Sequence, residues 1–328
     1  MAALFGGEYG IAPNASIYSV EAYQNLSGEL DWLIEQEVDV VNMSISTEKI
    51  GSYNSHAALA DYMIWSYGIT CCISAGNAAD DDVEMLCADL GMAYNAITVG
   101  MSGPYGALWY YTCHRTTNGV DKPTLCAYGH DVFIRGQNLT MTGTSLSAAV
   151  TTGVVALLME LDPTLKLYPQ KVTALLTASS DYLGDNSYLM DSGLADQGGS
   201  GVINFERAKE CINNIIYYQY DGTGESLDIL CTNNVSWSSD LLLRMSICWL
   251  AHSTGSVSSF RNNDFNVAIQ KISAGEVACS QGTAGTVDMI NYYTEYGGTH
   301  KVRILLGDDI VDYGPQDVFI CWSLRPIE

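Results

Sequence analysis

The stretch Gly143-Thr144-Ser145-Leu146-Ser147-Ala148-Ala149 carries the sharpest local pattern in the chain. Its glycine permits a close backbone approach, and the small residues that follow predict a helix that begins near Ser145 and packs tightly under a sheet. A serine at a helix N-terminus lies beside free N–H groups and the positive end of the helix dipole, which favour a developing oxyanion. On this segment alone, a simple N-cap serine on a buried helix remains the alternative.

Two other segments place polar residues at the ends of predicted strands. Ser74-Ala75-Gly76-Asn77 closes one apolar strand, and Asp39-Val40-Val41-Asn42-Met43-Ser44-Ile45 ends a neighbouring strand in the same way. In open α/β sheets, the groups that contact a ligand gather at the carboxyl ends of parallel strands. Both segments are therefore candidates for contact with a ligand.

The first two-thirds of the chain alternates strand-like and helix-like segments. This order predicts an α/β fold, a mostly parallel sheet with helices on both faces. The expected strands are Ala15–Val20, Val38–Ile45, Ile69–Ser74 and Ala96–Val99. The first expected helix runs from N-cap Ser27 to Glu37, and the second runs from N-cap Ser55 to just before Gly68. The third runs from about Ser145 to Asp162-Pro163, and the fourth covers Gln170–Ser179.

After about Lys209 the pattern changes to alternating apolar residues punctuated by Gly, Asn and Asp. A period of two predicts an antiparallel, jelly-roll-like β-sandwich. We therefore expect two domains, residues 1–212 and residues 213–328. Substrate docking or wall attachment is one interpretation of the second domain; stabilisation of the first domain by burying part of it is the other.

Together these motifs resemble the subtilisin-like serine peptidases, the subtilase family, from about Gly10 to Ala208. The similarity lies in the order and spacing of its pieces, and the sandwich resembles one appended to many bacterial subtilases. The matching pieces are Gly10-Ile11-Ala12-Pro13, Asp39–Ser46, Ser74–Asn77, Asn95–Gly100, Lys122-Pro123 with Ala127 and Gly129, Gly143–Ala148 and Gly199–Asn204.

The resemblance implies roles for the matched positions. Ser145, in the Gly143-Thr144-Ser145 turn, would be the acylating nucleophile of a serine endopeptidase. Asn77 would donate its side-chain N–H to the oxyanion, together with the backbone N–H of Ser145. Ser44, Ile45 and Ser46 would pair with an extended peptide or protein substrate, and Ala75 and Gly76 would line the first specificity pocket. Gly143 and Thr144 would also contact the substrate.

The resemblance is incomplete because the triad order in this family is Asp, His, Ser, and neither the Asp nor the His motif occurs here. Residues 1–4 resemble the later part of the His-bearing helix, so we expect a catalytic domain without its Asp- and His-bearing segments. Either the natural protein starts upstream or the chain is a pseudoenzyme, and the upstream DNA would decide. The histidines at 56, 114, 130, 252 and 300 match no catalytic position, and His56 is interpreted as a surface residue.

Composition limits the partners. A net charge of −23 excludes non-specific nucleic-acid binding, because that requires a basic patch. No apolar run reaches the roughly 18 residues of a membrane span, and no signal peptide is evident. The acidic run Asp80–Asp82 predicts a solvated loop, and the ten cysteines are interpreted as free thiols rather than a disulfide framework.

No cofactor is expected. The resemblance leaves room for structural calcium, but no calcium site can be assigned. It also implies an extracellular or cell-surface location. A sheet edge exposed by the missing segment would favour self-association. The leading hypothesis is a subtilase-type peptidase, a hydrolase that is inactive as this chain; the alternatives are a peptide-binding pseudopeptidase and an adhesion or interaction protein.

Overall fold

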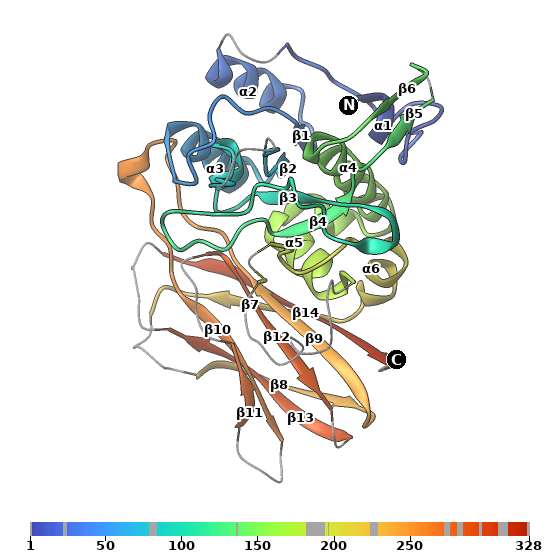
Figure 1. The fold of residues 1–328 in the computed structure, drawn as a ribbon. Coiled ribbons are helices and arrows are strands. Elements are labelled where there is room, and N and C mark those ends of the chain that lie inside the picture. The colour runs from blue at the N-terminus through green and yellow to red at the C-terminus, as the bar shows by residue number, and fades with distance from the viewer. Residues whose placement is uncertain are drawn as a thin grey trace.

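The computed structural model describes residues 2–21, 25–78, 84–135, 137–181, 194–195, 197–223, 229–271, 276–280, 285–294, 297–307 and 314–326. In this part of the chain an α/β unit precedes an antiparallel β unit (Figure 1). The helices of the α/β unit are α1 (Ala2–Phe5), α2 (Leu26–Glu35), α3 (Ser55–Tyr67), α4 (Thr144–Leu161), α5 (Pro169–Ser179) and α6 (Phe205–Cys211). Its strands are β1 (Val40–Met43), β2 (Thr70–Ser74), β3 (Ile97–Ser102), β4 (Leu125–Tyr128), β5 (Val132–Ile134) and β6 (Leu139–Met141).

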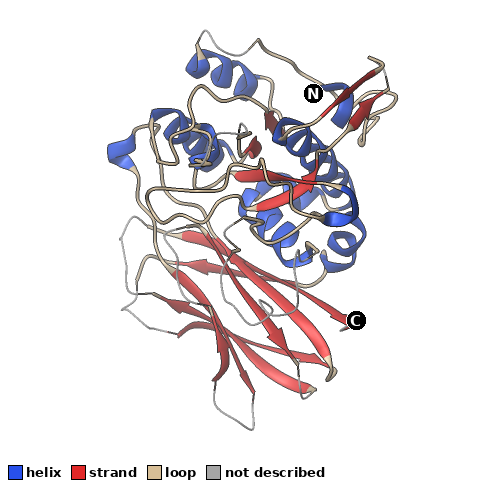
Figure 2. Cartoon of the chain, in the orientation of Figure 1, coloured by secondary structure: helices blue, strands red, loops and turns tan. Residues whose placement is uncertain are grey.

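The predicted α/β fold is confirmed. Strands β1, β2, β3 and β4 lie in that order, and every neighbouring pair is parallel. Alternate residues of the strands pack on opposite faces: Cys71 contacts a cluster that includes α2 and α3, whereas Cys72 contacts a cluster that includes α4 and α5. The sheet is therefore covered by helices on both faces, as Figure 2 shows.

Several expected elements differ in their bounds. Residues 15–20 form no strand, and the strand expected at 38–45 is limited to β1. The caps of α2 and α3 are Asn25 and Asn54, rather than Ser27 and Ser55, and each side chain accepts from the backbone N–H three residues further on. Serine and asparagine are equally good N-caps, so sequence alone misplaced these starts. Gly68 is the left-handed C-cap of α3, as predicted.

The predicted antiparallel sandwich is also confirmed. Two four-stranded sheets have the orders β11-β10-β13-β8 and β12-β9-β14-β7. They enclose a buried core that includes Trp249, Phe265 and Ile320. The strands are β7 (Ile215–Tyr220), β8 (Ile229–Trp237), β9 (Leu241–Cys248), β10 (Phe265–Lys271), β11 (Glu276–Cys279), β12 (Val287–Tyr293), β13 (Gly298–Leu306) and β14 (Gln316–Pro326). The boundary near residue 212 stays a prediction; in the structure α6 ends at Cys211 and β7 begins at Ile215.

The two units share one apolar core. Cys248 of β9 and Phe319 of β14 belong to the same buried cluster as Leu175 of α5. Polar contacts cross the same interface, because the Asn95 side chain donates to the Ala251 carbonyl (2.8 Å) and accepts from the Ala251 N–H (2.7 Å). In Figure 1, α5 lies between the parallel sheet and the sandwich. This packing supports a stabilising role for the sandwich.

Helix α4 is the centre of the α/β unit. This helix of 18 residues is long and apolar enough to cross a membrane by length and composition alone, but 67% of its residues are buried inside the structure. Burial of that extent is typical of the core helix of a folded domain. The ten cysteines are all free thiols, and eight of them are buried.

A buried carboxylate predicts a pH dependence of stability. Asp61 of α3 accepts from the N–H groups of Tyr94 and Asn95 (3.1 and 2.8 Å). Burial raises the pKa of Asp61 to about 6, although these bonds and Lys122 lower it. The folded state therefore holds the proton more tightly than the unfolded state, so the stabilisation present below about pH 4 is lost as the pH rises through about 6. Urea unfolding should show that the free energy of unfolding of the unsubstituted chain falls by about 2–3 kcal/mol between pH 4 and pH 7. The Asp61→Asn variant should not show this fall. An unchanged pH profile in the variant would contradict this assignment.

Candidate active site

Ser145 lies in the first turn of α4, directly after a turn that is packed against β4. Gly143 donates its N–H to the Gly129 carbonyl (2.9 Å). A Cβ at position 129 would lie 2.2 Å from the Ser147 hydroxyl, so only glycine allows this approach without a shift. The close packing of Gly129 therefore fixes the turn that presents Ser145.

The end of β1 contacts the same turn through two reciprocal hydrogen bonds. The Ser44 hydroxyl donates to the Ser145 carbonyl (2.7 Å), and the Ser145 hydroxyl donates to the Ser44 carbonyl (3.4 Å). The second bond is long and therefore weak. Ser145 is half-buried. A competing donor could thus replace the Ser145 hydroxyl at the Ser44 carbonyl and release it for other chemistry.

Asn77 follows β2 and is bound to the start of α4. Its Oδ1 accepts from the Thr144 N–H (2.8 Å) and from the Thr144 hydroxyl (3.2 Å). Because a backbone N–H bonds only to an acceptor, these contacts assign Oδ1 to that side of the amide and Nδ2 to the other. Asn77 is exposed, and its Nδ2 donates to no described residue. An amide donor is therefore available beside the helix N-terminus.

The backbone between β2 and Asn77 is held by the same threonine. Gly76 has φ 105°, which side chains with a Cβ rarely adopt, and its N–H donates to the Thr144 hydroxyl (3.2 Å). Ala75 is fully buried and donates its N–H to the Val99 carbonyl of β3 (3.0 Å). The position of Asn77 is thus determined by both the sheet and α4.

A cavity of about 320 Å³ joins these elements. Most of the sequence-predicted residues line it, whereas Ala75, Gly143 and Thr144 are buried behind its wall. Its lining residues are Ser44, Ile45, Ser46, Thr47, Glu48, Lys49, Ser74, Gly76, Asn77 and Ser145. The structure therefore brings the predicted serine, asparagine and strand end to one cavity.

Sequence reasoning missed the continuation of the wall beyond Ser46. Thr47, Glu48 and Lys49 line the cavity, and the Lys49 ammonium donates to the Asn77 carbonyl (3.3 Å). The available signal was their position immediately after the predicted substrate strand. These residues make the cavity polar and give it one carboxylate and one ammonium group.

Next to this wall, a histidine is paired with a buried carboxylate. His56 Nδ1 lies 2.8 Å from Asp89 Oδ2, and the Thr47 hydroxyl donates to the same oxygen (2.5 Å). Burial raises the pKa of Asp89, but the bonds from Thr47 and His56 outweigh it and leave the pKa below its usual value. The surface interpretation of His56 was incomplete, because its side chain is 35% exposed and bound to a fully buried carboxylate.

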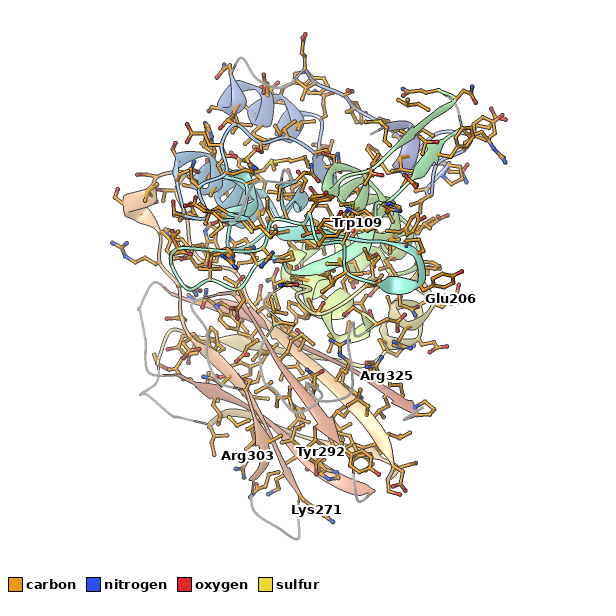
Figure 3. The ribbon with its side chains drawn as sticks, viewed as in Figure 1. Trp109, Glu206, Lys271, Tyr292, Arg303 and Arg325 are labelled. Carbon is orange, nitrogen blue, oxygen red and sulfur yellow. The ribbon has the colours of Figure 1, made fainter. Side chains whose placement is uncertain are left out.

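None of the five histidines, all within the described residues, forms a hydrogen bond with Ser145. His114 Nδ1 lies 3.0 Å from the Thr112 carbonyl, and the ring of His130 packs on Trp109 with centroids 3.8 Å apart (Trp109 is labelled in Figure 3). The remaining histidines occupy other sites: His56 bonds Asp89, His252 packs on Trp65 and His300 stacks on Trp237.

No group of three or more His, Cys, Asp or Glu side chains that could hold a metal ion occurs among the described residues. The predicted acidic loop Asp80–Asp82 lies outside that part of the chain.

Comparison with known proteins gives the family. Residues 3–201 match the subtilase family. Serine protease AprX of Bacillus subtilis (strain 168) is 24% identical over 249 residues, which are 62% of this chain and 53% of AprX. The chain thus spans about half the length of this curated relative.

Two solved structures have similar chains. The patellamide maturation protease PatA aligns with a TM-score of 0.45 and 19% identity over 56% of this chain and 66% of its own. A chain of the subtilase cytotoxin SubAB assembly aligns with a TM-score of 0.47 and 21% identity over 64% of this chain and 73% of its own. Because the family match covers more than half of the sequence, we conclude that this chain belongs to the subtilase family of serine peptidases.

Proposed function

We propose that the cavity beside Ser145 is the nucleophile and oxyanion half of a subtilase peptidase site that cleaves peptide bonds. The single observation that carries this proposal is the orientation of Asn77. Its Oδ1 is bound by the Thr144 N–H, which leaves Nδ2 to donate beside Ser145. A pure binding groove has no need of such a donor, whereas an oxyanion does.

In the proposed reaction, a peptide pairs with Ser44–Ser46 and its N–H takes over the Ser44 carbonyl, which frees the Ser145 hydroxyl. The Ser145 oxygen bonds to the substrate carbonyl carbon as its proton passes to a base. Asn77 Nδ2 and the Ser145 N–H stabilise the oxyanion. Collapse expels the protonated amine, and water then hydrolyses the acyl-enzyme.

This site lacks an identified base for the Ser145 hydroxyl. A serine hydroxyl needs an adjacent base, and no histidine is bonded to Ser145 in the described residues. We therefore expect this chain alone to have little peptidase activity. A small external base that enters the cavity should replace part of the missing function.

The test is labelling of Ser145 by a fluorophosphonate, followed by intact-mass spectrometry with and without imidazole. We expect slow labelling by the chain alone and at least a tenfold increase with imidazole, since general-base catalysis contributes about 10²–10⁴. Ser145→Ala should abolish labelling, and the exposed Ser258→Ala should not change it. Rapid stoichiometric labelling without imidazole would disprove the missing base, and labelling at another residue would disprove the role of Ser145.

A peptide-binding pseudopeptidase is the second candidate. The absence of a histidine bonded to Ser145 favours it. It differs from the first candidate in one measurable way, because peptides would bind while imidazole failed to promote labelling. In either case we propose a peptide or protein partner and, from the family alone, an extracellular or cell-surface location.

A further inference from the structure

The cavity beside Ser145 is supported by a third segment that joins its two walls. Ala88 donates its N–H to the Ala75 carbonyl, on the wall that follows β2 (2.8 Å). Its neighbour Asp89 donates its N–H to the Glu48 carbonyl, on the wall that follows β1 (2.9 Å). Both residues of this segment are fully buried. The two walls are therefore held at a fixed spacing, and a side chain that enters between them meets groups whose positions are already set.

The side chain of Asp89 determines how Thr47 faces the cavity. Asp89 Oδ1 accepts from the Thr47 N–H (3.2 Å), and Oδ2 accepts from the Thr47 hydroxyl (2.5 Å). His56 Nδ1 lies 2.8 Å from the same Oδ2. The hydroxyl proton of Thr47 thus points to Asp89, whereas Thr47 itself is exposed and lines the cavity. Its oxygen therefore offers lone pairs, and no proton, to a side chain in the cavity.

Several other donors that line the cavity are engaged in bonds of their own. The Ser44 hydroxyl donates to a backbone carbonyl of α4 (2.7 Å), and the Gly76 N–H donates to a hydroxyl of the same helix (3.2 Å). The Lys49 ammonium donates to a carbonyl of the opposite wall (3.3 Å). The hydroxyls of Ser46 and Ser74 can act as donors or as acceptors. An incoming side chain therefore gains most if it brings its own donors.

Glu48 adds a negative charge that no described residue pairs with. Its side chain is exposed, lines the cavity and forms no ion pair or hydrogen bond within the described part of the chain. The neighbouring cation, Lys49, is bound to the Asn77 carbonyl instead. A free carboxylate beside an acceptor favours a group that has both a positive charge and several donors. Among side chains, those of lysine and arginine have this chemistry.

We propose that the cavity selects substrates with lysine or arginine at the residue whose carbonyl group Ser145 attacks. This specificity rests on the proposed function, because a carbonyl held between Ser145 and Asn77 places its side chain between the two walls. The cationic group then bonds to the Glu48 carboxylate and to the Thr47 oxygen. Asp89 is a positioning residue in this arrangement, since it is buried and acts on the substrate through Thr47.

The test measures peptide binding to the Ser145→Ala chain, which cannot be acylated. The probes are fluorescent six-residue peptides with blocked ends, in which one residue among alanines is lysine, norleucine or glutamate. Norleucine has the carbon chain of lysine without the ammonium group. Fluorescence anisotropy should show that lysine binds about fivefold or more tightly than norleucine and that glutamate binds most weakly. Equal affinities, a preference for glutamate, or no binding of any peptide would overturn the proposal.

Removal of the free carboxylate locates the binding site. Glu48→Gln should bring the affinity of the lysine peptide to within about twofold of the norleucine peptide. A salt concentration of about 1 M should reduce the preference in the unsubstituted cavity as well, because salt screens an exposed ion pair. The matched control is the exposed Glu210→Gln on α6, which should leave the preference unchanged. A preference that survives Glu48→Gln would place the lysine outside this cavity.

Substitutions of Thr47 test the wall that Asp89 positions. Thr47→Ser keeps the hydroxyl that bonds to Asp89 and should retain the preference for lysine. Thr47→Val has nearly the same shape but no acceptor, so it should weaken binding of lysine and not of norleucine. Thermal melting confirms that both variants are folded at the temperature of the assay. Equal weakening of the two peptides in Thr47→Val would show that Thr47 only supports the wall, which contradicts the proposed recognition.

Failure of this proposal can be distinguished from failure of the proposed peptidase chemistry. A preference for lysine without fluorophosphonate labelling at Ser145 would leave a selective peptide-binding cavity and disprove the chemistry. Labelling at Ser145 together with equal binding of lysine and norleucine would retain the chemistry and overturn the specificity.

Discussion

Asn77→Ala is expected to lower the rate of imidazole-promoted labelling at Ser145 by about 10²–10³. Loss of one oxyanion-hole donor in subtilisin has this effect on kcat, and we transfer that magnitude rather than deriving it from the present structure. The physical reason is that Nδ2 would bond to the oxygen only once it carries charge. A drop of this size corresponds to about 2.7–4 kcal/mol of transition-state stabilisation.

Alanine alone would not prove this role, because Asn77 also binds the N–H of Thr144. Asn77→Asp separates the two functions. The aspartate keeps an acceptor for Thr144 and places a negative charge at the N-terminus of α4, which stabilises a helix by about 0.3–1 kcal/mol. It has no donor, however, and its charge repels the oxyanion.

We therefore expect Asn77→Asp to unfold at the same or a higher temperature than the unsubstituted chain while labelling at least 10²-fold more slowly. The exposed Asn118→Ala serves as the matched control and should change neither quantity. If Asn77→Asp is labelled at the normal rate, Asn77 serves only to cap the helix and has no oxyanion role.

The proximity of Ser145, Asn77 and Ser44 could be predicted because each lies at the end of a local element with a clear signal. Parallel strands place their carboxyl ends at one sheet edge, so residues that follow two neighbouring strands meet without any further information. The glycine before Ser145 and the small residues after it gave the start of α4 within one residue. Local pattern and tertiary geometry agree at these positions.

Other features depend on contacts between distant segments. Residues 15–20 have strand-like composition, but a strand exists only when a neighbouring edge pairs with it, and none does in the described structure. Asp89 and His56 lie 33 residues apart, and neither has a local pattern that indicates the other. The interface between the two units could not be predicted either. Arg244 bonds across this interface, but the strand that contains it has no local pattern that indicates the contact.

Arg244→Met is expected to have the largest effect on stability, a loss of about 3–5 kcal/mol. Arg244 lies on β9 and is 1% exposed. Its guanidinium donates to the carbonyls of Ser180 and Ser200 in the α/β unit and to Asn291 Oδ1 of β12 (3.1 Å). Methionine fills a similar volume but removes three hydrogen bonds from a charged donor, each of which is worth about 1.5–3 kcal/mol. The Ser200 carbonyl keeps the Ser180 hydroxyl as a donor (2.7 Å), whereas the Ser180 carbonyl loses the guanidinium.

The matched control is Arg303→Met on β13, which is labelled in Figure 3 and belongs to the sandwich sheet that does not include β9. Arg303 is only half-buried, so its loss should be below about 1 kcal/mol. Urea unfolding followed separately by Trp fluorescence and by far-UV circular dichroism gives both values. If the sandwich stabilises the α/β unit through this interface, we expect the two transitions to coincide in the unsubstituted chain and to separate in Arg244→Met. Equal losses for the two variants would show that the interface contributes no more than the rest of the sandwich, and a docking role would then be the better explanation of the second unit.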